Sequence, residues 1–273
     1  MKISIIIAYY NRRNLLLKTL ESMCNTRYKN LEVIIVDDAS ISSQSISDTP
    51  VMFPNLNIKV VRIEPVDKWW VNPCMPNNIG FAVATGDIII IQNPECLHIG
   101  DIVSHAVANM TANKYIAYGC YALDHSKTKQ IAHVNGGDTE AINNVIQPTN
   151  DILLDQCPHM NRWYQHSIYS DRCLNFCTAI TREDLEDLGG FDEEYALGIS
   201  YDDTEFIARI KKKGMNVSMV DIPMVIHQCH GYTDYSNKLL VQRNTDLYYN
   251  TLKSDNFRVD NVRTKTLIGG LLK

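Results

Sequence analysis

The chain has 273 residues, of which 45% are hydrophobic, and a formal net charge of −5. This length allows one large domain with a substantial core, and the acidic balance argues against a nucleic-acid-binding protein. No apolar run approaches the roughly 20 residues of a membrane-spanning helix, and no signal-peptide cleavage site follows the short apolar N-terminus. We therefore expect a soluble, cytoplasmic protein with at most peripheral membrane contact.

Predicted strands and helices alternate over the first hundred residues. Apolar, β-branched runs predict strands at 3–7, 31–36, 58–63 and 88–91. Pro76 suits the first position of a helix that continues to Ala84. This alternation predicts an α/β fold with a Rossmann-like, mostly parallel central sheet flanked by helices.

The regular alternation is lost over residues 121–172, which contain paired Gly and Asn residues and scattered aromatic residues. We interpret this stretch as loops and short strands over one edge of the sheet. A strand at 176–180 follows, and Thr181 with Asp184 has the spacing of a helix cap. A helix is predicted over 203–213, and it ends at the following glycine.

One strand of the predicted sheet ends in Asn93-Pro94-Glu95. Proline removes a donor from the strand ladder, so an amide and a carboxylate stand at the carboxyl end of a buried strand. Open α/β sheets bind ligands at that edge, and a cation that bridges phosphates takes carboxylate oxygens such as those of Glu95. The sequence therefore predicts a nucleotide and metal site here.

Two other predicted strands end in polar residues at the same edge. A nucleotide base can stack on Tyr9 or Tyr10, and Asp37 or Asp38 can accept a hydrogen bond from a base imide. The alternative is that Asp38 serves only as a turn or helix-cap residue.

Two further clusters contain residues suited to catalysis or metal binding. Asp202 and Asp203 begin a predicted helix, where a carboxylate either caps the helix or takes a proton from a hydroxyl nucleophile. His227 ends a short apolar run, with His230 three residues later. A neutral imidazole there completes a Mn²⁺ site begun by Glu95, or is a hydrogen-bonded structural residue.

The order and spacing of six segments resemble family-2 glycosyltransferases of the GT-A fold, and the resemblance covers residues 3–231. The six segments are 4–12, 32–40, 78–80, 84–87, 93–95 and 189–193.

The resemblance implies a donor site in which the end of the first strand and the two aspartates after the second hold the nucleotide base, most often uracil. The residues that it assigns to the donor are Ala8, Tyr9, Tyr10, Asn11, Arg12, Asp37, Asp38, Asn78 and Asn93. Asn93-Pro94-Glu95 falls where the family has its D-x-D element. Glu95 would then bind Mn²⁺ or Mg²⁺ on the diphosphate.

The resemblance also implies the catalytic roles. Asp203 matches the catalytic base, Asp202 a residue that binds acceptor or sugar, and His227 the late metal-binding histidine, with His230 as second choice. Trp163 is a candidate acceptor contact because aromatic faces stack on sugar rings, although core packing is the alternative.

Three positions depart from the family pattern. Ala8 replaces the usual proline, which leaves the backbone hydrogen bonds available. Asn77 stands where many members have an arginine, for which Lys68 or Arg62 could compensate. Asn93 replaces the first carboxylate of the D-x-D element, which lowers the negative charge of the metal site.

These residues together predict a metal-dependent, inverting glycosyltransferase that moves a sugar from a nucleotide-diphosphate sugar, most often UDP-linked, to a hydroxyl of a glycan, lipid or protein. We expect a transferase domain over 1–235, with a donor half at 1–120 and an acceptor half at 121–235. A helical or flexible tail would follow at 236–273. The alternatives are a non-catalytic nucleotide- or glycan-binding protein derived from a transferase, and a sugar nucleotidyltransferase, which usually has an early glycine-rich phosphate loop.

Overall fold

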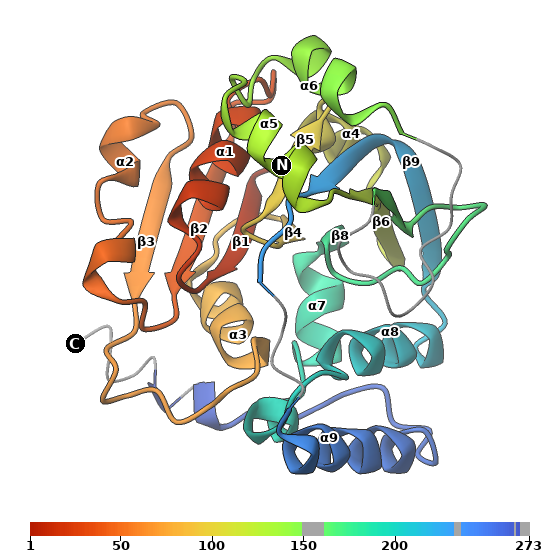
Figure 1. The fold of residues 1–273 in the computed structure, drawn as a ribbon. Helices are drawn as coiled ribbons and strands as arrows, with labels where there is room; N and C mark the ends of the chain where they lie inside the picture. The colour runs from red at the N-terminus through yellow and green to blue at the C-terminus, as the bar shows by residue number, and fades with distance from the viewer. Residues whose placement is uncertain (149–160, 232–235, 265, 268–273) are drawn as a thin grey trace.

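The computed structural model describes residues 1–148, 161–231, 236–264 and 266–267. Within these residues nine strands form one sheet in the order β3-β2-β1-β4-β8-β6-β9-β5, and β7 pairs with β6 (Figure 1). The strands are β1 (Ile3–Tyr9), β2 (Leu31–Asp37), β3 (Ile58–Arg62), β4 (Ile88–Gln92), β5 (Cys96–Ile99), β6 (Lys114–Ala122), β7 (Arg162–Gln165), β8 (Cys177–Thr181) and β9 (Asn216–His227).

Helices cover both faces of this sheet, and two short 3-10 helices lie in its connections (Figure 1). The α-helices are α1 (Arg13–Met23), α2 (Thr49–Met52), α3 (Cys74–Val83), α4 (Ile102–Asn109), α5 (His125–Ala132), α6 (Thr139–Ile146), α7 (Arg182–Leu188), α8 (Asp202–Lys212) and α9 (Lys238–Thr251). The 3-10 helices are η1 (Ser42–Gln44) and η2 (Glu193–Leu197).

The first four strands form a parallel block, as the sequence predicts. Successive residues of a strand point to opposite faces, so Ile5 packs in one apolar cluster and Ile6 in a second cluster on the other face. Ile34 and Ile35 of β2 divide in the same way. Burial on both faces explains why these strands are continuous apolar runs.

Beyond β4 the sheet becomes mixed. β8 runs antiparallel to both β4 and β6, β9 is parallel to β6, and β5 and β7 are antiparallel to their partners. Because β8 is antiparallel to β4, its first residue, Cys177, lies opposite Gln92 at the end of β4. The residues just before β8 are therefore placed beside Asn93-Pro94-Glu95, and the Asn93 amide donates to the Phe176 carbonyl at 3.0 Å.

Two expectations about local structure were wrong. Helix α3 begins at Cys74, not at Pro76, because the Asn72 side chain accepts a hydrogen bond from the Cys74 amide and starts the turn earlier. The stretch 121–172, expected to hold loops and short strands, contains α5 and α6 as well as β7. Aspartate side chains cap both helices, and their isoleucines pack in a third apolar cluster with Tyr121.

The capping pair that the sequence indicates before α7 is confirmed, since the Thr181 side chain accepts a hydrogen bond from the Asp184 amide. After β9, α9 runs along the lower edge of the view, below α7 and α8 (Figure 1). Asn244 of α9 is fully buried and donates to the Ser200 carbonyl just before α8. No described helix is both long and apolar enough to cross a membrane.

Candidate active site

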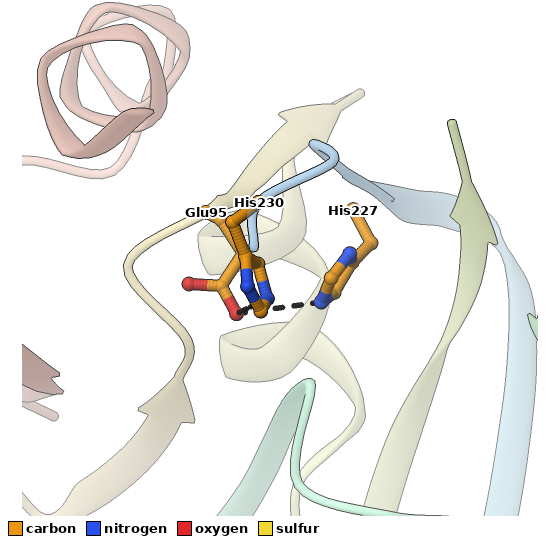
Figure 2. Close-up of side chains that lie close together, drawn as sticks. All are labelled: Glu95, His227 and His230. Carbon is orange, nitrogen blue, oxygen red and sulfur yellow. Dashed lines mark ion pairs between the residues drawn. The ribbon is translucent and has the colours of Figure 1, made fainter. Parts of the chain in front are cut away.

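Three candidate metal ligands from distant parts of the chain converge at the carboxyl edge of the sheet (Figure 2). Glu95 lies in the turn between β4 and β5, and His227 ends β9, where it pairs with the neighbouring Cys96. The Nε2 atoms of His227 and His230 lie 3.3 and 3.4 Å from the same oxygen of Glu95, Oε1. The three ligand atoms all lie within 4.8 Å of one another.

The second oxygen of the same carboxylate, Oε2, forms an ion pair with the Arg12 guanidinium at 2.8 Å. Although burial opposes ionisation, Arg12 and the two imidazoles hold the pKa of Glu95 well below its usual range. Burial also lowers the pKa of His227, which keeps that ring neutral and able to act as a ligand. One carboxylate and two imidazoles fit Mn²⁺ better than Mg²⁺, which prefers oxygen ligands alone.

The two aspartates that follow β2 already have partners within the chain. Asp37 forms an ion pair with Arg62 at 2.6 Å. Asp38 pairs with Lys68 at 2.8 Å and accepts a hydrogen bond from the Trp70 indole at 2.8 Å. Burial raises the pKa of Asp38, although these two partners oppose the change. The cations Arg62 and Lys68 thus neutralise these aspartates, a contact that the sequence did not indicate.

The structure separates the two tyrosines proposed for base stacking. Tyr9 is fully buried in the first apolar cluster and donates to the Gln44 carbonyl at 2.6 Å, so the expectation that its ring stacks on a base was wrong. Tyr10 points to the other side of the strand end and is 50% exposed, with the Lys68 ammonium 4.2 Å from its ring centroid. Only Tyr10 of the pair can offer a face to a ligand.

Three of the residues assigned to the donor help to build this edge of the sheet. The Asn11 side chain accepts from the Ile41 amide at 2.9 Å, which joins the turn after β1 to the loop after β2. Asn78 exchanges two hydrogen bonds with the Phe191 backbone at 2.8 and 2.9 Å, which gives it a structural role in place of the expected donor contact. Ala8 lies opposite Val36 in the parallel ladder.

The two aspartates at the start of α8 are each held by one asparagine. Asn72 donates to Asp202 at 3.0 Å, and Asn175 donates to Asp203 at 3.0 Å. Burial raises the pKa of both carboxyls, and the negative charge of Asp203 raises that of Asp202 further. The sequence analysis did not single out either asparagine, because neither belongs to a recognisable local motif.

Trp163 and Tyr164 point to opposite sides of β7. Trp163 is buried in the third apolar cluster, with its ring centroid 5.1 Å from that of Tyr121. The Tyr164 ring lies 5.0 Å from the His227 ring and stacks on Phe176 at 5.2 Å. Of this pair of aromatic residues, the structure therefore places Tyr164, and not Trp163, beside the candidate metal ligands.

Solved structures share this fold. The UDP complex of residues 1–349 of TarS from S. aureus is similar over 100% of this chain and 71% of that one, with a TM-score of 0.61 and 16% identity. The mannosyltransferase PcManGT from Pyrobaculum calidifontis, in complex with GDP-Man and Mn²⁺, is similar over 98% and 79%, with a TM-score of 0.54 and 15% identity. The fold is therefore that of the GT-A glycosyltransferases.

The sequence matches show the family. The model of glycosyl transferase family 2 matches residues 4–171, and a model described as the N-terminal domain of galactosyltransferase matches residues 161–233. The chain belongs to glycosyl transferase family 2.

Curated relatives agree with this assignment over part of their length. An uncharacterized glycosyltransferase of Rickettsia conorii is 26% identical over 199 residues, which are 71% of this chain and 32% of that protein. One of Rickettsia felis is 29% identical over 137 residues, which are 50% of this chain and 22% of that protein. The chain thus spans about a fifth to a third of the length of the curated relatives it matches.

Proposed function

We propose that this glycosyltransferase moves a sugar from a nucleotide-diphosphate donor, most often UDP-linked, to an acceptor hydroxyl in a metal-dependent reaction that inverts the anomeric carbon. One observation carries the proposal: two consecutive residues connect the metal ligands to the catalytic pair. Asn175 donates to Asp203, while the Phe176 ring lies 5.7 Å from the His227 ring. The leaving diphosphate and the attacking hydroxyl can therefore be held on opposite sides of one anomeric carbon.

The donor nucleotide would lie across the ends of β1 and β2. Tyr10 offers the exposed aromatic face for the base, beside the ion pair between Asp38 and Lys68. Similar solved structures are complexes with UDP, UDP-GlcNAc and GDP-Man, which supports a nucleotide-sugar donor. Asn93, which is half-buried after β4, would contact the ribose or the sugar.

The diphosphate would face Glu95 and the two histidines. A divalent cation bound there supplies positive charge that stabilises the leaving diphosphate. Arg12 already lies against Glu95 and adds a second positive charge on the same side. In a dry site these fixed charges stabilise the developing negative charge more strongly than water does.

Asp203 would take the proton of the acceptor hydroxyl, since burial raises its pKa toward the range in which a general base operates. The hydroxyl attacks the anomeric carbon from the side opposite the diphosphate, so one displacement inverts the configuration. Asp202 would orient the acceptor or the sugar. The Tyr164 ring, beside His227, is the proposed stacking surface for a sugar ring.

We further propose the division of the chain expected from the sequence, with donor binding mainly in 1–120 and acceptor binding in 121–235. The acceptor class is a hydroxyl-bearing glycan, lipid or protein. Within 236–267 as described, α9 and the segment after it pack on the second apolar cluster through Leu247, Tyr248 and Phe257.

Calorimetric titration with UDP, UDP-GlcNAc, GDP and GDP-mannose, each with and without Mn²⁺, tests the proposal. We expect one nucleotide to bind in the micromolar range, more tightly with Mn²⁺. Glu95→Gln should abolish the Mn²⁺ effect, whereas the matched variant Asp203→Asn should keep it. If folded wild-type protein binds none of these nucleotides, the proposed donor class is wrong.

A further inference from the structure

Asp202, which is buried, and Asp203, which is half-buried, differ from the buried carboxylates Glu95, Asp37 and Asp38 in the groups that face them. Within the described residues neither Asp202 nor Asp203 forms an ion pair, and each accepts from one buried asparagine amide. Asn72 is 2% exposed and Asn175 is 3% exposed. An amide donor stabilises a carboxylate without the fixed positive charge that would hold the proton away from it.

The Asn175 amide is oriented by two buried hydroxyls. Its carbonyl oxygen, Oδ1, accepts from the Tyr115 hydroxyl at 2.6 Å and from the Thr178 hydroxyl at 3.1 Å. Tyr115 and Thr178 are both fully buried on adjacent strands, β6 and β8. With the oxygen occupied in this way, the amide N–H groups can point only toward Asp203.

The Asn72 amide is oriented by a backbone group. Its oxygen accepts from the Cys74 amide at 2.9 Å, and a backbone N–H can only donate, so the Asn72 nitrogen must face Asp202. The same nitrogen approaches the Ser200 carbonyl at 3.4 Å. Ser200 and Tyr201 have positive φ angles of 65° and 68°, so this contact also supports the unusual backbone that starts α8.

We propose that Asn175 is a positioning residue for the general base: oriented by Tyr115 and Thr178, it donates one hydrogen bond that aims the Asp203 carboxylate and keeps it ionised. Asn72 does the same for Asp202. The inference deepens the proposed function and rests on it. The titratable groups that face Asp203 are Asp202 from the same helix and the Tyr115 phenol from β6.

Carboxyl-carbon NMR titration of Asp203, assigned with Asp203→Asn, tests this role without any substrate. The titration midpoint of Asp203 is compared with and without each substitution, first in the wild-type protein and then in an Asp202→Asn background. The second background is needed because two coupled carboxylates titrate as a pair. Asn175→Ala should raise the titration midpoint of Asp203 by about one pH unit, the effect of losing one donor to a charged acceptor. Tyr115→Phe, which keeps the asparagine but frees its amide to rotate, should raise it by less.

A purely structural role for Asn175 predicts the opposite sign. If the substitution only admits water, relief of burial lowers the pKa of Asp203 toward its ordinary value. An unchanged or lower midpoint in both Asn175→Ala and Tyr115→Phe would overturn the inference. Asn72→Ala is the matched control, and it should move the midpoint of Asp202 more than that of Asp203.

Activity gives a second readout. In the Asn175 variant the acid limb of the pH–rate profile, for transfer or for slow donor hydrolysis, should move to higher pH with the same sign as the NMR midpoint. The change should fall on kcat, with KM for the donor within about twofold, because the residue acts on the base. If the wild-type protein binds no nucleotide, the proposed function is wrong. The NMR titration would still decide whether Asn175 positions the Asp203 carboxylate.

Discussion

The candidate metal-ligand cluster and the aspartate pair of α8 both contain buried carboxylates, but the chain stabilises their charges in different ways. Glu95 is surrounded by an arginine and two imidazoles, whereas Asp202 and Asp203 are surrounded by amides. The pKa of Glu95 is accordingly held far below its usual range despite burial, while burial raises the pKa of both aspartates.

The difference corresponds to two chemical tasks. A ligand for a cation must stay ionised at every working pH, and a neighbouring guanidinium ensures this. A general base must accept a proton during the reaction, which a fixed cation would oppose and an amide does not. Asp38 is an intermediate case, since burial raises its pKa even though Lys68 is paired with it. The predictions below test this contrast, beginning with the largest expected effect.

Removal of the proposed general base should have the largest effect. Asp203→Asn should lower the rate of sugar transfer by about 10²–10⁴-fold, because a neutral amide cannot take the acceptor proton. Binding of the nucleotide, measured by calorimetry, should change by less than about twofold. Asp255→Asn, at an exposed position, is the matched control and should be active. Retained turnover in Asp203→Asn would remove this residue from the catalytic role.

One turn further along α8, a fully buried ion pair should dominate stability. The Nε atom of Arg209 lies 2.6 Å from Glu205, and the same guanidinium donates to the carbonyls of Leu188 and Gly190. Arg209→Met should lower the free energy of unfolding by about 3–5 kcal/mol, since it leaves Glu205 buried and unpaired. Urea denaturation measures the change, and the double variant Glu205→Leu/Arg209→Met should recover part of it. A cost below about 1 kcal/mol would contradict this account.

Arg12 should affect the metal and the nucleotide in opposite directions. It competes with a cation for Glu95 when no nucleotide is bound, but it adds to the positive charge that faces a bound diphosphate. Arg12→Gln should therefore strengthen Mn²⁺ binding by about tenfold in the absence of nucleotide and weaken nucleotide binding by about tenfold in the presence of Mn²⁺. Arg13→Gln is the control, because Arg13 pairs with Asp48 instead. If Arg12→Gln changes the Mn²⁺ affinity and the nucleotide affinity in the same direction, Arg12 does not compete with the cation for Glu95.

The smallest expected effects concern the pH dependence of stability, and they have opposite signs for Glu32, which donors hold ionised, and for Asp202. Burial raises the pKa of Glu32, but hydrogen bonds from Lys2, Ser4 and Thr85 outweigh it and lower the value to about 2. The stability that Glu32 provides is therefore present above its unfolded pKa and is lost as the pH falls toward 2. Glu32→Gln should cost about 1–2 kcal/mol at pH 7 and little near pH 2.

The pKa of Asp202 is higher in the folded state than in the unfolded state, so the native protein binds more protons at this site. The contribution of Asp202 to the free energy of unfolding therefore becomes unfavourable as the pH rises above its pKa in the unfolded state. Asp202→Asn should therefore stabilise the protein by about 1 kcal/mol at pH 8 and have little effect at pH 4. Urea denaturation at the stated pH values measures both variants. Equal signs for Glu32→Gln and Asp202→Asn near neutral pH would contradict the contrast between a carboxylate with a lowered pKa and one with a raised pKa.

Much of the donor side could be predicted because its signals are local. The isoleucine and valine runs of β1, β2 and β4 predict buried strands, and the polar residues that end them must lie at one edge if the strands are parallel. Glu95 and His227 could be proposed as partners in this way, and the structure brings them together. Residues 121–172 could not be predicted as well, because α5 and α6 are short and lie among Gly and Asn residues.

The sequence by itself therefore determined the family, the parallel block of the sheet, and the acidic and histidine residues that can do the chemistry. Only the tertiary structure decided which partner each of them has. Asn72 and Asp202 are 130 residues apart in the chain, and they meet because the strand pairing places the start of α3 beside the start of α8. No local pattern marks such a contact, since a single hydrogen bond between distant segments depends on the register and direction of the strands between them.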